Sequence, residues 1–144
     1  MSAEEKINIL LVDDQPNNLI LLEDILQSPE YHLVKAYSGK EALRHILKIN
    51  FAVILLDIMM PDLNGFETAR LIRQRRQSRQ IPIIFITALD QDQATGHSLG
   101  VIDYLSKPFD IDILKSKVSG FVDLYKRAQQ AEQERKARAD AEAA

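Results

Sequence analysis

The chain has 144 residues, of which 46% are hydrophobic and 27% are charged, and its net charge is −3. This length fits one compact domain with some residues to spare, and the weak negative charge excludes a general basic field for nucleic acid. The absence of cysteine excludes disulfides and thiolate metal sites, and the apolar runs are too short for a membrane span or a signal peptide.

The first half of the chain alternates between strand and helix patterns. The apolar run 7–12 predicts a strand, and Pro16 suits the first turn of a helix with an aliphatic stripe. The shorter, less apolar segment 32–37 predicts an edge strand. Ser38 and Glu41 have the spacing of a helix capping box, so we expect a second helix to start there.

A central strand is predicted at residues 53–56, where four successive apolar residues indicate burial on both faces. Asp57 follows at its carboxyl end, before Pro61, Asn64 and Gly65 force a loop. In a parallel α/β sheet, ligands bind at the carboxyl ends of the strands, so Asp57 is a candidate site residue.

A third helix is predicted from the apolar spacing of Phe66, Ala69 and Ile72. It ends in a basic tract that contains Arg73, Arg75, Arg76 and Arg79. We interpret this tract as a solvated helix end, with a docking patch as the alternative.

The second half continues the alternation. Residues 82–86 predict a buried strand with Thr87 at its carboxyl end, and residues 101–105 predict a short last strand before Lys107. Between them, segment 90–99 is a weak helix pattern with little apolar surface, and we expect it to be mobile. Strands that alternate with helices in this way predict a parallel sheet with helices on both faces.

Five polar residues fall at or just beyond the carboxyl ends of these strands, and right-handed crossovers bring them to one edge of the sheet. They are Asp13, Asp14, Asp57, Thr87 and Lys107. Three crowded carboxylates repel one another unless a hard cation such as Mg²⁺ intervenes. Phosphoryl transfer to a carboxylate fits this set, with Asp57 as the nucleophile and Lys107 pairing with a phosphoryl oxygen.

Residues 7–125 resemble the receiver domain of two-component response regulators. The motifs that carry the resemblance are Leu11-Val12-Asp13-Asp14, residues 55–65 around Asp57, Ile86-Thr87-Ala88 and residues 103–109 around Lys107. The resemblance implies a doubly wound, flavodoxin-like α/β fold of five parallel strands in the order 2-1-3-4-5. It also implies a cytoplasmic regulatory domain rather than an enzyme, which passes a signal to a downstream output domain or protein.

The resemblance further implies that a partner histidine kinase phosphorylates Asp57. Asp14 and Asp57 would bind Mg²⁺ directly, with the backbone carbonyl of Met59 as a third ligand and Asp13 acting through water. Leu89 and Met59 would flank the route of the attacking water. Because both side chains are apolar, we expect slow autodephosphorylation.

Two residues would form the switch that the resemblance implies. Thr87 would donate a hydrogen bond to the phosphoryl group, and Tyr104 would turn inward in the active state. The readout face would then combine the fourth helix, the fifth strand and the fifth helix. The Lys107-Pro108 peptide bond would be cis.

Other classes of protein need a different sequence. A P-loop nucleotidase is excluded because the chain has no glycine-rich loop that ends in Gly-Lys-Ser or Gly-Lys-Thr. An interaction-only module with the same fold remains open, as does a Mg²⁺-dependent phosphatase with an aspartyl-phosphate. The phosphatase would need a pocket-forming insert, for which the connections are short.

The last helix is predicted to start near Asp110 or Asp112 and to run past Tyr125, since residues 128–144 lack Gly and Pro and favour helix. Acid-first pairs at i, i+4 support it, namely Asp123/Arg127, Glu132/Lys136 and Glu134/Arg138. Alanine is the tail's only apolar residue, so a solvated, fraying extension is the alternative.

We divide the chain into an N-terminal extension (1–6), a receiver domain (7–125) and a helical extension or linker able to form a coiled coil (126–144). The extension is expected to pair with a second copy in a parallel homodimer and to pass the signal to a following domain. Its balanced charge argues against binding to nucleic acid.

Overall fold

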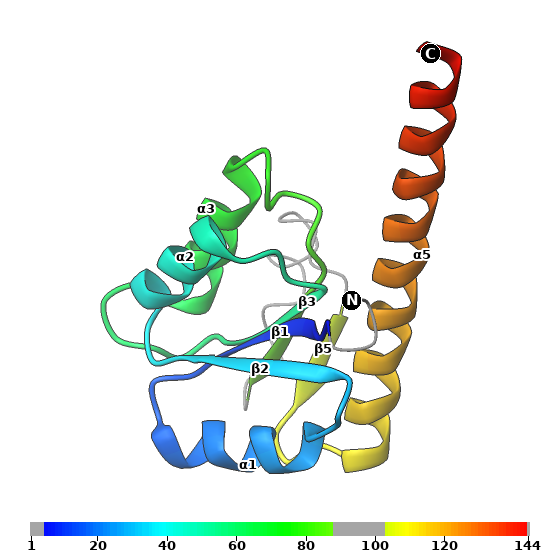
Figure 1. Ribbon diagram of the computed structural model, residues 1–144. Coiled ribbons are helices and arrows are strands. Elements are labelled where there is room, and N and C mark those ends of the chain that lie inside the picture. The colour runs from blue at the N-terminus through cyan, green and yellow to red at the C-terminus, as the bar shows by residue number, and fades with distance from the viewer. Residues whose placement is uncertain (1–4, 88–102, 144) are drawn as a thin grey trace.

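The computed structural model describes residues 5–87 and 103–143. Five parallel strands form one sheet in the order β2-β1-β3-β4-β5, which confirms the predicted order (Figure 1). The strands are β1 (Ile7–Val12), β2 (Tyr31–Ala36), β3 (Val53–Asp57), β4 (Ile83–Thr87) and β5 (Asp103–Ser106). The predicted edge strand is β2, one residue earlier than expected, and the predicted helix 90–99 and Leu89 lie outside the described residues.

The four described helices cover both faces of the sheet (Figure 1). They are α1 (Pro16–Leu26), α2 (Gly39–Lys48), α3 (Gly65–Gln74) and α5 (Ile111–Ala143). α1 and α5 bury Leu19 and Leu114 against one face, and α2 and α3 bury Ile46 and Ile72 against the other. Each fully buried aliphatic side chain of this size contributes about 1.5–3 kcal/mol, so the apolar stripes fix which face each helix covers.

Side chains at the helix starts explain where α2 and α3 begin. The Ser38 hydroxyl accepts the amide hydrogen of Glu41 at 3.1 Å, which forms one half of the predicted capping box. At α3, Asn64 and Glu67 form a full capping box. Asn64 and Gly65 were expected only to form a loop, but Asn64 caps the helix and Gly65 is its first residue.

Gly65 allows α3 to begin directly above the end of β3. A Cβ atom at this position would lie 2.4 Å from the carbonyl oxygen of Asp57, well inside van der Waals contact. The amide of Gly65 also donates to the carbonyl oxygen of Ile58 at 2.9 Å. The glycine is therefore required for a close approach of backbone to backbone beside Asp57.

Helix α5 has 33 residues and confirms the predicted long C-terminal helix. Its start is capped by Asp110, whose Oδ1 accepts the amides of Asp112 and Ile113. The last part of α5 projects away from the sheet (Figure 1), and residues 126–143 are exposed. No helix in the described ranges is long and apolar enough to span a membrane.

Ion pairs along the α5 extension differ from those predicted. The three i, i+4 pairs are not among the ion pairs of the described residues. Glu132 instead pairs with Arg135 one position closer, at 2.5 Å. Both spacings bring side chains to the same helix face, so sequence spacing alone does not decide between them.

Candidate functional site

Three carboxylates meet at the carboxyl edge of the sheet. Asp57 is the last residue of β3, and Asp13 and Asp14 follow β1 directly. The pairing of Val12 with Leu56 places the ends of these neighbouring strands side by side. One oxygen from each carboxylate lies within 4.8 Å of the others, so the structure brings together the three acids that the sequence predicted.

Asp13 is only 2% exposed, and hydrogen bonds fix both of its oxygens. Oδ1 accepts the backbone amide of Gln15 at 2.9 Å, and Oδ2 accepts the side-chain amide of Asn18 at 3.1 Å. Sequence reasoning missed Asn18. The available signal was a polar residue in the first turn of the helix that follows the acid pair.

Lys107 provides the positive charge of the site. Its Nζ lies 3.5 Å from Oδ2 of Asp13 and 3.8 Å from Oδ1 of Asp57. The residue follows β5, and its backbone amide donates to the carbonyl oxygen of Thr87 at 2.7 Å. The Lys107-Pro108 peptide bond is cis, as expected.

The pKa of Asp57 is raised from 3.8 to about 6. Burial is the largest cause, because it removes water from the charged carboxylate, and the nearby charge of Asp13 adds to it. Lys107 and a backbone hydrogen bond from Met59 act in the opposite direction. The positive charge of Lys107 and the Met59 hydrogen bond therefore only partly offset the effects of burial and of the neighbouring carboxylates on this pKa.

The remaining predicted residues that the structure describes lie on β4, on β5 and in the loop after β3. Thr87 is the last residue of β4 and is buried, whereas the Met59 side chain is 61% exposed beside the site. Tyr104 is half-buried in β5 and packs against Phe85, with ring centroids 5.4 Å apart. Phe85 in turn meets Phe66 of α3 edge-on, which links the β5 aromatic ring to the helix that starts beside Asp57.

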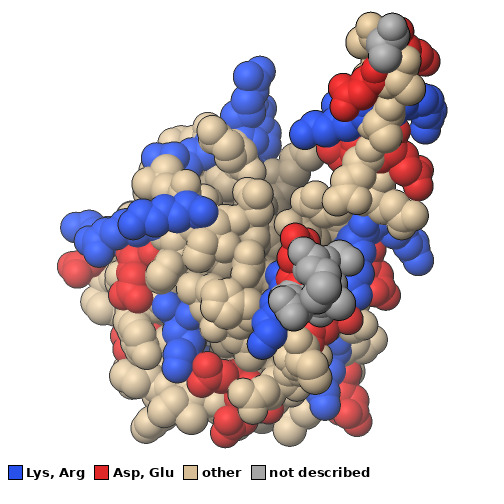
Figure 2. Space-filling model, viewed as in Figure 1, with Lys and Arg blue, Asp and Glu red and all other residues tan. Residues whose placement is uncertain are grey.

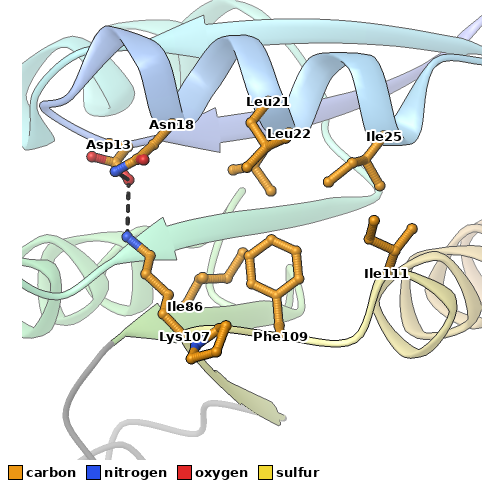
Figure 3. Close-up of a pocket in the computed structure, with 10 residues that line it drawn as sticks. Asp13, Asn18, Leu21, Leu22, Ile25, Ile86, Lys107, Phe109 and Ile111 are labelled. Carbon is orange, nitrogen blue, oxygen red and sulfur yellow. Dashed lines mark hydrogen bonds and ion pairs between the residues drawn. The ribbon is translucent and has the colours of Figure 1, made fainter.

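An apolar cavity of about 290 Å³ borders the site between α1 and the segment after β5 (Figure 3). Asp13, Asn18 and Lys107 form its polar end. Leu21, Leu22, Ile25, Ile86, Pro108, Phe109 and Ile111 form the rest of its lining. The ion pair between Asp13 and Lys107 therefore lies where the cavity meets the carboxylate cluster (Figure 3).

The donor set fits a hard divalent cation. Carboxylate oxygens are the ligands that Mg²⁺ prefers, and the three acids offer oxygens close enough to share one ion. Asp14 is the most accessible of the three, since it is half-buried while Asp13 and Asp57 are buried. Asp13 is already held by two protein donors, which leaves Asp14 and Asp57 with the greater capacity to bind a metal.

A doubly wound five-stranded sheet with three acids and a lysine at its carboxyl edge defines a CheY-like receiver fold. The chain belongs to the response regulator receiver domain family, whose model matches residues 9–119. This establishes a receiver domain of two-component signalling, a class of regulatory switches rather than conventional enzymes.

Relatives and solved structures agree with this assignment. The chain is similar to a probable cyclic di-GMP phosphodiesterase of Vibrio cholerae, with 37% identity over 82% of this chain and 27% of that protein. It is also similar to the response regulator ArlR of Staphylococcus haemolyticus, with 38% identity over 77% of this chain and 50% of that protein. The chain thus spans between about a quarter and a half of these curated relatives.

Among solved structures, the chain is similar to the receiver domain of the sensor histidine kinase PA1611 from Pseudomonas aeruginosa. The TM-score is 0.74 and the identity 32%, over 83% of this chain and 99% of that one. That structure has a magnesium ion coordinated in its active site cleft.

Proposed function

We propose that the chain is a phosphorylation-activated switch that accepts a phosphoryl group on Asp57 from a histidine kinase. The observation that carries this proposal is the position of Lys107, whose Nζ lies within 4 Å of both Asp13 and Asp57. A buried carboxylate beside a cation and two further acids is equipped to attack phosphorus and to hold the product's negative charge.

In the proposed reaction, an oxygen of Asp57 forms a bond to phosphorus while the phosphorus–nitrogen bond of the donor phosphohistidine breaks. The leaving imidazole takes up a proton. Lys107 pairs with a phosphoryl oxygen, and the Thr87 hydroxyl donates a hydrogen bond to another. Gln15 and Asn18 hold Asp13 in place, so that the acid cluster does not rearrange during transfer.

Asp14, Asp57 and the Met59 backbone carbonyl would hold Mg²⁺, with Asp13 acting through water. When bound, the ion would neutralise negative charge on the phosphoryl oxygens. Replacing Asp14 by Ala should weaken Mg²⁺ binding by about tenfold or more, because the site loses a charged ligand. Titration calorimetry against an Asp24→Ala control, which removes an exposed acid of α1, tests this assignment.

The proposed readout uses Thr87 and Tyr104. Thr87 moves toward the phosphoryl group, and the Tyr104 ring fills the space that it leaves. The existing contact between Tyr104 and Phe85 supports this route, because a ring already packed in the core needs only a small movement to turn further inward. Identical amide exchange at Tyr104 with and without a phosphoryl mimic would contradict this route.

We further propose that residues 7–125 form the receiver domain and that residues 126–144 pass its state to an output domain or pair with a second copy. The exposed surface of residues 126–143 supports a role outside the receiver core. The Lys126–Glu30 ion pair, at 2.7 Å, anchors the first exposed turn of this extension to the receiver.

A small phosphodonor separates the proposed switch from its two alternatives. With acetyl phosphate and Mg²⁺, a switch gains one phosphoryl group per chain and then releases phosphate only at the slow rate of its autodephosphorylation. An interaction-only module gains none, and a phosphatase releases phosphate over many turnovers. Intact-protein mass spectrometry together with a phosphate-release assay distinguishes these three results.

A further inference from the structure

A group of exposed cations lies on the outward side of α2 and α3, away from the α1 and α5 side that contains the apolar cavity. We call it the α2–α3 basic surface, and its members are Arg44, Lys48, Arg70, Arg75, Arg76 and Arg79. Lys and Arg side chains gather over these two helices and the turn after α3 (Figure 2). Since α2 and α3 pack side by side, the group covers one continuous region of the fold (Figure 1).

The charge of this region opposes that of the whole chain. Residues 39–81 contain eight Lys and Arg but four Asp and Glu, whereas the chain as a whole has a net charge of −3. Of those four acids, Glu41 and Glu67 stand in the first turns of α2 and α3, and Asp57 belongs to the phosphorylation site. Within the described residues, no member of the α2–α3 basic surface forms an ion pair.

The turn that presents three of these arginines is built by internal hydrogen bonds. Ser78 is 1% exposed, and its hydroxyl donates to the carbonyl oxygen of Ile72 at 2.7 Å. Arg73 is not part of the surface, because its guanidinium donates to the carbonyl oxygen of Ile81 at 2.8 Å. A frayed helix end would not show these bonds, so Arg75, Arg76 and Arg79 extend from an ordered base.

Two large apolar side chains are exposed on the same helices. Leu47 is 58% exposed on α2, between Arg44 and Lys48 in sequence, and Leu71 is 37% exposed on α3, next to Arg70. A nucleic-acid backbone offers no apolar complement to leucine. None of the exposed large hydrophobic residues on α2 and α3 is aromatic, so these helices offer a base no exposed Phe, Tyr or Trp ring on which to stack.

We propose that the α2–α3 basic surface binds an acidic amphipathic segment of another protein, whose carboxylates pair with the arginines and whose apolar side chains cover Leu47 and Leu71. Guanidinium groups suit this role because their planar fork can pair with a carboxylate through two hydrogen bonds. The interaction lies beyond the proposed phosphorylation function, since no member of the surface contacts Asp57.

The test uses a labelled helical peptide of about 20 residues, with Leu at every third or fourth position and Glu elsewhere, and fluorescence anisotropy as the readout. The full chain should bind this peptide saturably, and added salt should weaken the binding. The triple variant R44E/R70E/R76E should bind about tenfold more weakly, because each exposed pair contributes up to about 1 kcal/mol. The matched control K115E/R127E/R138E changes three exposed cations of α5 and should bind as the wild type does.

The apolar part of the proposal has its own variant pair. Leu47→Gln should weaken binding several-fold, whereas Leu124→Gln, at a 56% exposed leucine of α5, should have no effect. Binding should persist in Asp57→Asn, which separates a failure of this proposal from a failure of the phosphorylation function.

Four results would overturn the proposal. They are the absence of saturable peptide binding, equal binding of a peptide with every Leu replaced by Gln, tighter binding of a DNA duplex through the same arginines, and self-association without peptide that the triple variant abolishes. The second result would indicate a bare polyanion, the third a nucleic acid and the fourth a second copy of this chain.

Discussion

Nζ of Lys107 lies 3.8 Å from Oδ1 of Asp57, although the two residues are 50 positions apart and Lys107 follows a strand that is not a neighbour of the Asp57 strand in the sheet. The lysine is 30% exposed in its side chain, whereas the Asp57 side chain is only 8% exposed. One partly accessible cation thus faces a buried anion. We therefore expect loss of the Lys107 charge to have opposite effects on metal binding and on phosphorylation.

Replacing Lys107 by Ala should slow labelling of Asp57 by about a hundredfold, because one preorganised charge contributes on the order of 3 kcal/mol to a transition state. The same variant should bind Mg²⁺ more tightly, since a competing positive charge has been removed. Stopped-flow labelling and metal titration measure the two effects separately. If both labelling and metal affinity fell, Lys107 would support the fold rather than the chemistry.

The raised pKa of Asp57 predicts a pH-dependent cost in stability for the metal-free protein. Its pKa is about 6 in the folded state, against 3.8 as the ordinary value, so the folded state binds the proton more tightly. Protonation of Asp57 therefore stabilises the folded state fully below about pH 4, and this contribution is lost as the pH rises through about 6.

Asp57→Asn removes this titration. In EDTA, we compare the free energy of unfolding of the variant minus that of the wild type. This difference should be larger at pH 7.5 than at pH 4, by on the order of 2 kcal/mol. Urea unfolding of both proteins at the two pH values measures this change. Subtracting the wild type from the variant at each pH cancels the titration of the other carboxylates. Parallel pH dependences of the two proteins would contradict the raised pKa.

Slow loss of the phosphoryl group follows from the apolar residues proposed to flank the attacking water. The exposed side chain of Met59 cannot orient a water molecule as an amide or carboxylate can. Introducing Met59→Asn together with Leu89→Glu should therefore speed autodephosphorylation several-fold. The decay of the labelled protein gives the rate, and an unchanged or slower decay would show that these positions do not control the lifetime.

The helical extension is predicted to support a weak parallel dimer. Residues 126–143 form a regular helix whose side chains are exposed, and its described side-chain contacts are surface pairs such as Lys126–Glu30 and Glu132–Arg135, which stabilise it only weakly. Sedimentation of the full chain should show more self-association than a version that ends at Arg127. Equal self-association of the two would assign the dimer contact to another surface.

The sequence was sufficient to predict the fold because its periodicities are clear. The uninterrupted apolar run before Asp57 indicates a doubly buried strand, and all five residues of β3 are buried. The acidic cluster was predictable for a related reason, since topology brings the carboxyl ends of parallel strands to one edge.

Other features depend on distances that no spacing rule supplies. Asn18 contacts Asp13 only because α1 begins where it does, and Gly65 is required only because α3 approaches the Asp57 carbonyl. Glu132 can reach a cation at either i+3 or i+4, so its pairing with Arg135 rather than Lys136 does not follow from spacing alone. The arginines after α3 are exposed, as the interpretation of this tract as a solvated helix end requires, but the Ser78 hydrogen bond that orders the turn has no signature in the sequence.

Intact-protein mass spectrometry after incubation with acetyl phosphate and Mg²⁺ measures whether Asp57 receives the phosphoryl group. Asp57→Asn keeps the size of the side chain but removes its nucleophilic charge, while Asp24→Asn changes an exposed acid of α1 as the control. We expect one added phosphoryl group in the wild type and the control and none in Asp57→Asn. Undiminished labelling of Asp57→Asn would contradict this expectation.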